Sequence, residues 1–230
     1  MYRLKNYMKR YSFDIQKGSK GQSFVELSIV VLLLMLLVAG IAEFGVLLNR
    51  YLNIVDGARE AARYGANYDP FAACVADANG NITGTPDSDG ICSDYYTSSA
   101  KMAVDVINPI VLNTVAPLKD DIVISIFVLA NNHFCRFPTG SENGWSWSQM
   151  VEGLATPDHT SAQSSASIQS QMNPSAPAVS AMLVEIFYNY PQTLKAPFYD
   201  QFFPDPVPVY SYAIMPLKNV YPPSGPCHVP

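Results

Sequence analysis

Three residues near the N-terminus, Gly21, Gln22 and Glu26, have types and spacing that point to chemistry. Glu26 lies at the start of a long apolar run, where a carboxylate needs a partner because its burial otherwise costs several kcal/mol. Cleavage of the peptide bond between Gly21 and Gln22 would give Gln22 a positive α-amino group one helical turn from Glu26. The spacing therefore predicts a processing site and an acid–amine pair, formed within one helix or between packed subunits.

The apolar run that follows is long enough to cross a bilayer. Residues 27–42 contain no charge, and if Glu43 is allowed the run continues through Leu48. A helix of this length spans roughly 33 Å, about the thickness of the hydrocarbon core. Glu43 either marks the end of the membrane segment or pairs with Arg50 or a neighbouring subunit, and we favour the boundary.

Charge is distributed unevenly on the two sides of this run. Residues 1–21 hold six basic side chains and one acid, whereas residues 65–230 hold five basic side chains and fourteen acids. Because Lys and Arg are retained on the cytoplasmic side, we expect the N-terminus in the cytoplasm and the remainder outside it. The acidic remainder attracts phosphate weakly, which argues against nucleic acid as a partner.

The N-terminal motifs resemble those of a known family. Gly-x-x-x-x-Glu before an apolar helix is the prepilin processing signature, which the pseudopilins of the Tad (tight adherence, or Flp) pilus share. TadE-like proteins are similar to this chain in their ordered motifs as well, here GQSFVE at 21–26, the apolar run, GIAEFG at 40–45 and DGAREAARYGA at 56–66. Further on, residues 183–191 and 208–215 resemble the late strand pair of that family.

The resemblance implies a minor pilin or pseudopilin that takes part in assembling or initiating a Tad/Flp-type pilus. It implies residence in the inner membrane with a single span, and on the cell surface after assembly. The implied partners are a prepilin peptidase, other pilin subunits, membrane lipid before assembly, and the inner-membrane assembly platform with its ATPase. Leu27 replaces the aromatic residue that commonly follows the motif glutamate, and Gln22 replaces the Phe of type IVa pilins, which leaves the identity of the peptidase open.

Three alternatives remain beside this interpretation. The chain could be a major filament subunit, or a membrane-tethered binding domain that is never processed. Secretory cleavage after Ala42 is a further alternative, since small residues at alternate positions suit signal peptidase. Against secretory cleavage, helical patterning continues across residue 42 without a break.

The organisation predicted for the whole chain is α+β. We expect a long N-terminal pilin-like helix, membrane-embedded in its first half, followed by a small antiparallel sheet with one further helix. The expected segments are a basic leader (1–21), the transmembrane half of the helix (22–48), its extracytoplasmic half (49–68) and the α+β domain (69–230). Within that domain we expect loops at 77–94 and 131–180, a helix at 99–113, and strands at 122–130, 181–190 and 207–215.

Four cysteines, all beyond the apolar run, predict disulfides in an oxidising compartment. Four cysteines allow three pairings. Closeness in sequence favours Cys74 with Cys92, which leaves Cys135 with Cys227.

No cofactor, metal or enzyme activity is predicted. The 77–94 loop alternates Asp and Asn like a calcium loop, but it lacks glycine at the sixth position and glutamate at the twelfth. His133 with Cys135 and Cys227 with His228 match no common zinc spacing. Asp158, His159 and Ser161 are close in sequence, but a triad requires convergence on a rigid frame. Trp145 and Trp147 are expected to pin the 131–180 loop to the domain, with an exposed contact patch as the alternative.

Overall fold

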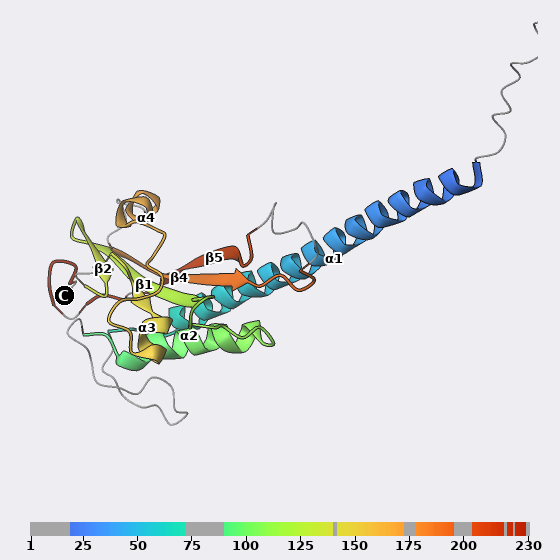
Figure 1. Ribbon diagram of the computed structural model, residues 1–230. Coiled ribbons are helices and arrows are strands. Elements are labelled where there is room, and N and C mark those ends of the chain that lie inside the picture. Colours follow the sequence, from blue (N-terminus) through green and yellow to red (C-terminus); the bar gives the residue numbers. More distant parts are fainter. Residues whose placement is uncertain are drawn as a thin grey trace, which may run out of the picture. The chain divides into compact units, whose positions relative to one another are not determined.

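The computed structural model describes residues 19–71, 90–139, 142–172, 178–195, 204–218, 220–222 and 224–228. The chain forms two compact units whose boundary lies between Phe44 and Gly45. The helix α1, Ser19–Ala66, contributes residues to both units, and the strands of the described residues lie in the second (Figure 1). An α+β fold with a long N-terminal apolar helix is thereby confirmed.

In the second unit α1 buries one face and exposes the other. Ile54, Ala58, Ala61 and Ala62 are fully buried, and they recur at steps of one, three and four residues as an amphipathic helix requires. The helix ends at Ala66, two residues before the expected end. The backbone N–H of Asn67 then bonds the carbonyl of Tyr64 at 3.1 Å.

The helix α2, Ser93–Ile107, is shifted from its expected position at 99–113. It begins six residues earlier, inside the expected 77–94 loop, because Tyr95 and Tyr96 are buried in the core and extend its apolar face. It ends before Pro109 because proline disfavours the helical conformation at the preceding residue, and Asn108 accordingly has a non-helical ψ of 131°.

The sheet is antiparallel, in the order β2-β1-β4-β5, with β3 also paired to β1. The three expected strands correspond to β1 (Asp121–Ala130), β4 (Ala178–Tyr190) and β5 (Val207–Leu217). The expectation of a continuous loop over 131–180 was wrong. That segment holds β2 (His133–Phe137), β3 (Trp145–Ser146), α3 (Trp147–Glu152) and α4 (Ser165–Gln171).

Strand β1 is buried on both faces, so every one of its residues is shielded from solvent. Ile122, Ile124 and Ile126 share a core with the buried residues of α1 and α2. Phe127 and Leu129 pack on the other face with Ile168 of α4. A strand covered on both sides is expected to be a nearly continuous apolar run, and residues 122–130 form one.

The two tryptophans hold the 131–172 segment against the core, as the pin interpretation expects. Trp145 stacks on Tyr96 of α2 with ring centroids 5.5 Å apart and planes 11° apart. Trp147 meets Trp145 edge to face at 6.4 Å. Both rings are half-buried and pack against the main core.

Candidate functional site

The predicted processing site lies in the first turns of α1. Gln22 and Glu26 are exposed on the same helical face, and the Gln22 side-chain amide donates a hydrogen bond to Glu26 Oε1 at 3.1 Å. This contact shows that the i, i+4 spacing brings the two side chains together. Gly21 is exposed, and no atom lies within 4 Å of the position that a Cβ would occupy there. Packing among the described residues therefore does not require glycine at this position.

The remainder of the first unit's helix presents apolar side chains to its surroundings. Large side chains are exposed at nearly every position between Phe24 and Ile41, at 42% to 74% of their full surface. Consecutive residues point around the whole circumference of a helix, so this segment has no polar face. Such a surface requires lipid or other helices around it. By length and composition α1 can cross a membrane, which suggests a membrane anchor.

Glu43 and Arg50 fall on opposite sides of the boundary between the units. Glu43 is the one buried residue among 21–44, at 9% exposure, and Arg50 is half-buried in the second unit. Burial raises the pKa of Tyr188 on β4, and the nearby Arg50 charge partly offsets this increase. Arg50 therefore lies beside the end of β4, while its pairing with Glu43 stays a prediction.

The structure contains the expected disulfide between Cys135 and Cys227, with an S–S distance of 2.04 Å. It ties the C-terminal tail to strand β2, and Asn131 adds a hydrogen bond to the His228 carbonyl at 2.8 Å. Cys92 is also disulfide-bonded, whereas its expected partner Cys74 lies outside the described residues.

The cysteines and the acidic residues of the described segments do not form a metal site. A disulfide consumes the two thiolates that the zinc alternative requires. Among the described residues no cluster of three or more His, Cys, Asp or Glu side chains is placed to hold a metal. Most of the calcium-like loop, residues 77–89, lies outside the described part of the chain.

The residues that resembled a triad have separate structural partners. Asp158 forms an ion pair with Lys119 at 3.3 Å. The His159 ring stacks on Phe187 with centroids 4.5 Å apart, and the Ser161 hydroxyl donates to Glu185. These contacts fix the 142–165 segment on the sheet and give Asp158, His159 and Ser161 three different partners.

Three buried carboxylates, Asp120, Asp121 and Glu185, are the feature that sequence reasoning missed. Asp121 is fully buried and accepts hydrogen bonds from the hydroxyls of Ser146 at 2.7 Å and Ser148 at 2.9 Å, and from the Ser148 backbone N–H at 2.8 Å. Glu185 accepts from the Tyr210 hydroxyl at 2.7 Å. Burial raises the pKa of Asp120, although two backbone N–H groups stabilise its charged form. The three carboxylates hold connecting segments in place through these hydrogen bonds. Most of their partners are distant in the chain, so no local sequence pattern predicts the contacts.

Comparison with known proteins locates a family likeness in α1. Residues 21–63 match the family model of TadE-like protein. The match begins at Gly21, includes Gln22 and Glu26, and ends three residues before the end of the helix. No curated protein and no solved structure matches the chain.

Proposed function

We propose, from the TadE-like match over residues 21–63, that the chain is a minor pilin or pseudopilin of a Tad/Flp-type pilus. In this role it takes part in assembling or initiating the filament. The observation that carries the proposal is that the match begins at Gly21 and includes both the Gln22–Glu26 contact and the part of α1 that exposes large apolar side chains. A pilin requires a processing site, a packing charge and an apolar helix in this order.

Processing would hydrolyse the peptide bond between Gly21 and Gln22. The products are a carboxylate on Gly21 and an α-amino group on Gln22, which is protonated near neutral pH. The new amine would lie one turn from the Glu26 carboxylate, at the positive end of the helix dipole. As the subunit leaves lipid for a bundle of helices, the amine of one chain can neutralise Glu26 of the same chain or of the next. This pairing would set the axial position of each subunit.

The proposed topology places residues 1–21 in the cytoplasm, α1 across the inner membrane and the α+β domain outside. Six basic residues against one acid before the span support this orientation, because Lys and Arg are retained on the cytoplasmic side. The Cys135–Cys227 disulfide supports an oxidising compartment for the domain. The proposed partners are a prepilin peptidase, other pilin subunits, and the assembly platform, whose ATPase would supply the energy.

The processing step is tested by co-expressing the full chain with a Tad-type prepilin peptidase and sequencing the mature N-terminus. We expect the mature chain to begin at Gln22. Gly21→Leu should abolish cleavage, and Gly45→Leu is the matched control, because a Cβ at either glycine has open space around it within the described residues. Loss of cleavage in the first variant alone would then reflect recognition by the peptidase. A mature chain that begins at Met1 rejects processing, and one that begins at Glu43 supports secretory cleavage.

The packing role is tested with Glu26→Gln in cells that assemble the pilus. We expect normal cleavage, with much less of the chain in sheared filaments, because the amine of Gln22 loses its charged partner. Asp105→Asn, at an exposed position of α2 in the second unit, is the control and should assemble normally. Unimpaired assembly of Glu26→Gln removes the packing role. A chain that makes up most of the sheared filament would be a major subunit instead.

A further inference from the structure

The unit formed by residues 45–230 exposes a group of large apolar side chains at one end. Val111 is 83% exposed and Val115 is 55% exposed, both in the segment between α2 and β1. Leu194, which follows β4, is 50% exposed, and on α1 Leu48 and Leu52 are 45% and 54% exposed. We call this group of five residues the basal surface.

Contacts within the unit place these side chains at a common end. Gly57 of α1 lies against Ile107 at the end of α2, and Gly65 accepts a hydrogen bond from Tyr95 near its start. The helix α2 therefore runs antiparallel to α1, as Figure 1 shows for the green helix beside the C-terminal part of α1. The segment that follows α2 is thus directed toward the residues with which α1 enters the unit.

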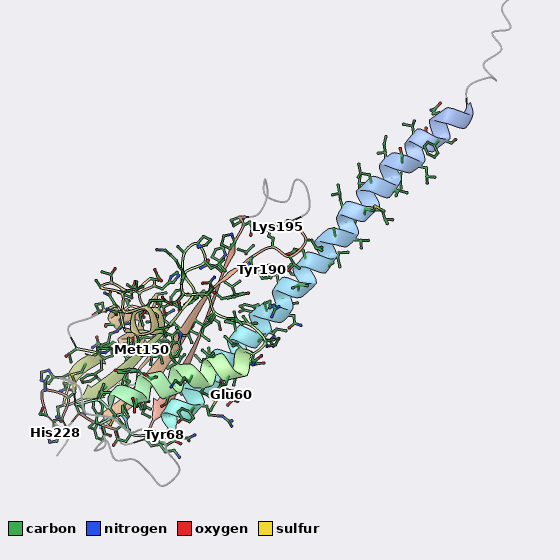
Figure 2. The ribbon with its side chains drawn as sticks, turned by 60° about the horizontal axis from the view of Figure 1, so that its bottom comes forward. Glu60, Tyr68, Met150, Tyr190, Lys195 and His228 are labelled. Carbon is green, nitrogen blue, oxygen red and sulfur yellow. A yellow bond between two sulfur atoms is a disulfide. The ribbon has the colours of Figure 1, made fainter. Side chains whose placement is uncertain are left out.

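Strand β4 ends on the same side. The side chain of Asn189 donates a hydrogen bond to the Leu118 carbonyl. Tyr188 lies near Arg50, and the positive charge of Arg50 lowers the pKa of the Tyr188 hydroxyl against the effect of burial. Figure 2 shows Tyr190 and Lys195 at the end of the unit opposite to Tyr68 and His228. Leu194 therefore lies at the same end of the unit as residues 108–118 and the first α1 residues of the unit.

Chain connectivity indicates what covers this surface. Gly45 follows Phe44 directly, so the end of the unit that holds Gly45 lies within a few residues of the apolar part of α1. The exposed apolar positions of that segment continue into the unit at Val46, Leu48 and Leu52. If a bilayer surrounds the apolar residues of α1 before Gly45, its surface lies close to Val46, Leu48 and Leu52. Apolar side chains can insert into that surface region of the bilayer.

The charge of the basal surface favours lipid over a charged protein partner. Residues 108–118 contain no charged side chain. The two basic residues that flank the exposed loops are each neutralised, Lys119 by Asp158 at 3.3 Å and Lys195 by Asp205 at 3.6 Å. Glu152 adds one carboxylate beside this segment, where it accepts a hydrogen bond from Thr114 at 2.6 Å. The five residues of the basal surface are themselves apolar, as are side chains at the boundary between headgroups and acyl chains.

We propose that, before assembly, the basal surface inserts into the outer headgroup region of the membrane that α1 crosses. The inference rests on the proposed function only in that α1 must span that membrane. Val111, Val115 and Leu194 would enter about 5–10 Å, the depth reached by interfacial apolar side chains. The domain is then held on the lipid, and extraction into a filament must remove both the helix and this surface from the bilayer.

The test uses the full chain reconstituted in phosphatidylcholine vesicles that contain acyl chains brominated near the headgroup, which quench tryptophan by contact. A tryptophan is added at Val111 and, in a second variant, at Leu194. Both sites are at least half exposed, so neither substitution disturbs the core. Gln169→Trp is the matched control, because this exposed position lies on α4, which packs at the Phe127 and Leu129 end of β1. Leu34→Trp reports on the span itself.

We expect the added fluorescence at positions 111 and 194 to be quenched at least about twofold more than that at position 169, without dependence on salt. If Leu34→Trp is quenched and positions 111 and 194 behave like 169, the inference is overturned while the membrane span stands. If Leu34→Trp is not quenched either, the span fails and the inference fails with it. If tryptophans at positions 111 and 194 become buried only when a second copy of the chain is present, and lipid has no effect, the surface serves subunit packing. That result would also overturn the inference.

Discussion

The two parts of α1 share one regular backbone and differ in what surrounds them. Residues 21–44 expose large apolar side chains around the whole helix, whereas residues 45–66 bury Ile54, Ala58, Ala61 and Ala62 in the domain core. The first part contains a single charge before Glu43, and the second carries charges on its exposed face. The chain itself covers one face of the second part, but something outside the chain must cover the large apolar side chains of the first.

This contrast separates stability from assembly. Residues that the chain covers contribute to the folding of the domain, because their burial removes apolar surface from water. Residues that the chain leaves exposed contribute to lipid or subunit contacts, and their loss should leave the isolated domain unchanged. Matched substitutions in the two parts of the same helix therefore test the contrast directly.

The largest effect is expected for Ile54→Ala, which removes a fully buried side chain from the core. It should lower the free energy of unfolding of the domain by about 2–4 kcal/mol, as a cavity-forming substitution does. The measurement is denaturant unfolding in detergent, followed by the fluorescence of Trp145 and Trp147, which both lie in the second unit. Ile41→Ala, at a position 65% exposed, should leave this transition in place. Equal losses in both variants would contradict the contrast.

Sequence patterns predicted the parts of the fold whose signals are local. The apolar run and the β-branched strand β1 are each contained in one short stretch, so composition and residue type revealed them. Strands β4 and β5 include the two segments that the resemblance to TadE-like proteins implied as a strand pair. An oxidising compartment predicted disulfides, and the closeness of Cys74 and Cys92 in sequence left Cys135 to pair with Cys227, as the structure has it.

The missed parts depend on contacts between distant segments. Strand β3 and helix α3 are held by the Asp121 carboxylate, which bonds Ser146 and Ser148 some 25 residues further along the chain. The start of α2 depends on Tyr96, whose ring stacks on Trp145. A Ser-rich or Gly-rich stretch is predicted as a loop when its distant contacts are unknown, because it contains too few apolar side chains to form a core by itself.

An intermediate effect is expected for Gly57→Ala, which tests how closely the second part of α1 packs. A Cβ at position 57 would overlap Ile107 Cγ2, a branched side chain with little freedom to move, so we expect a loss of about 1–3 kcal/mol in domain stability. Gly65→Ala should cost less, because the overlapping group there is the flexible end of Met182. Gly45→Ala has open space and should be neutral or raise stability by up to about 1 kcal/mol. The same unfolding experiment gives the order, and a loss at position 45 as large as at 57 would contradict it.

The smallest effect is expected on the exposed face of the second part of α1. Arg63 pairs with Glu60 at 2.8 Å, but the two side chains are 70% and 41% exposed, so Arg63→Ala should cost only about 0.2–0.5 kcal/mol. Arg59→Ala should cost less, since its distance to Asp56 is 3.8 Å and both side chains are about two-thirds exposed. Both differences should shrink at high salt in the same unfolding measurement.

A loss above about 1 kcal/mol for Arg63→Ala would mean that this face is not a solvated one, because exposed pairs do not contribute that much. With the expected small loss, the charges of the second part add little to the fold. They then remain available to neighbouring subunits, since no core contact constrains them. A defect in filament assembly without a defect in unfolding would place Arg63 among the residues that act between chains, as the first part of α1 is proposed to do.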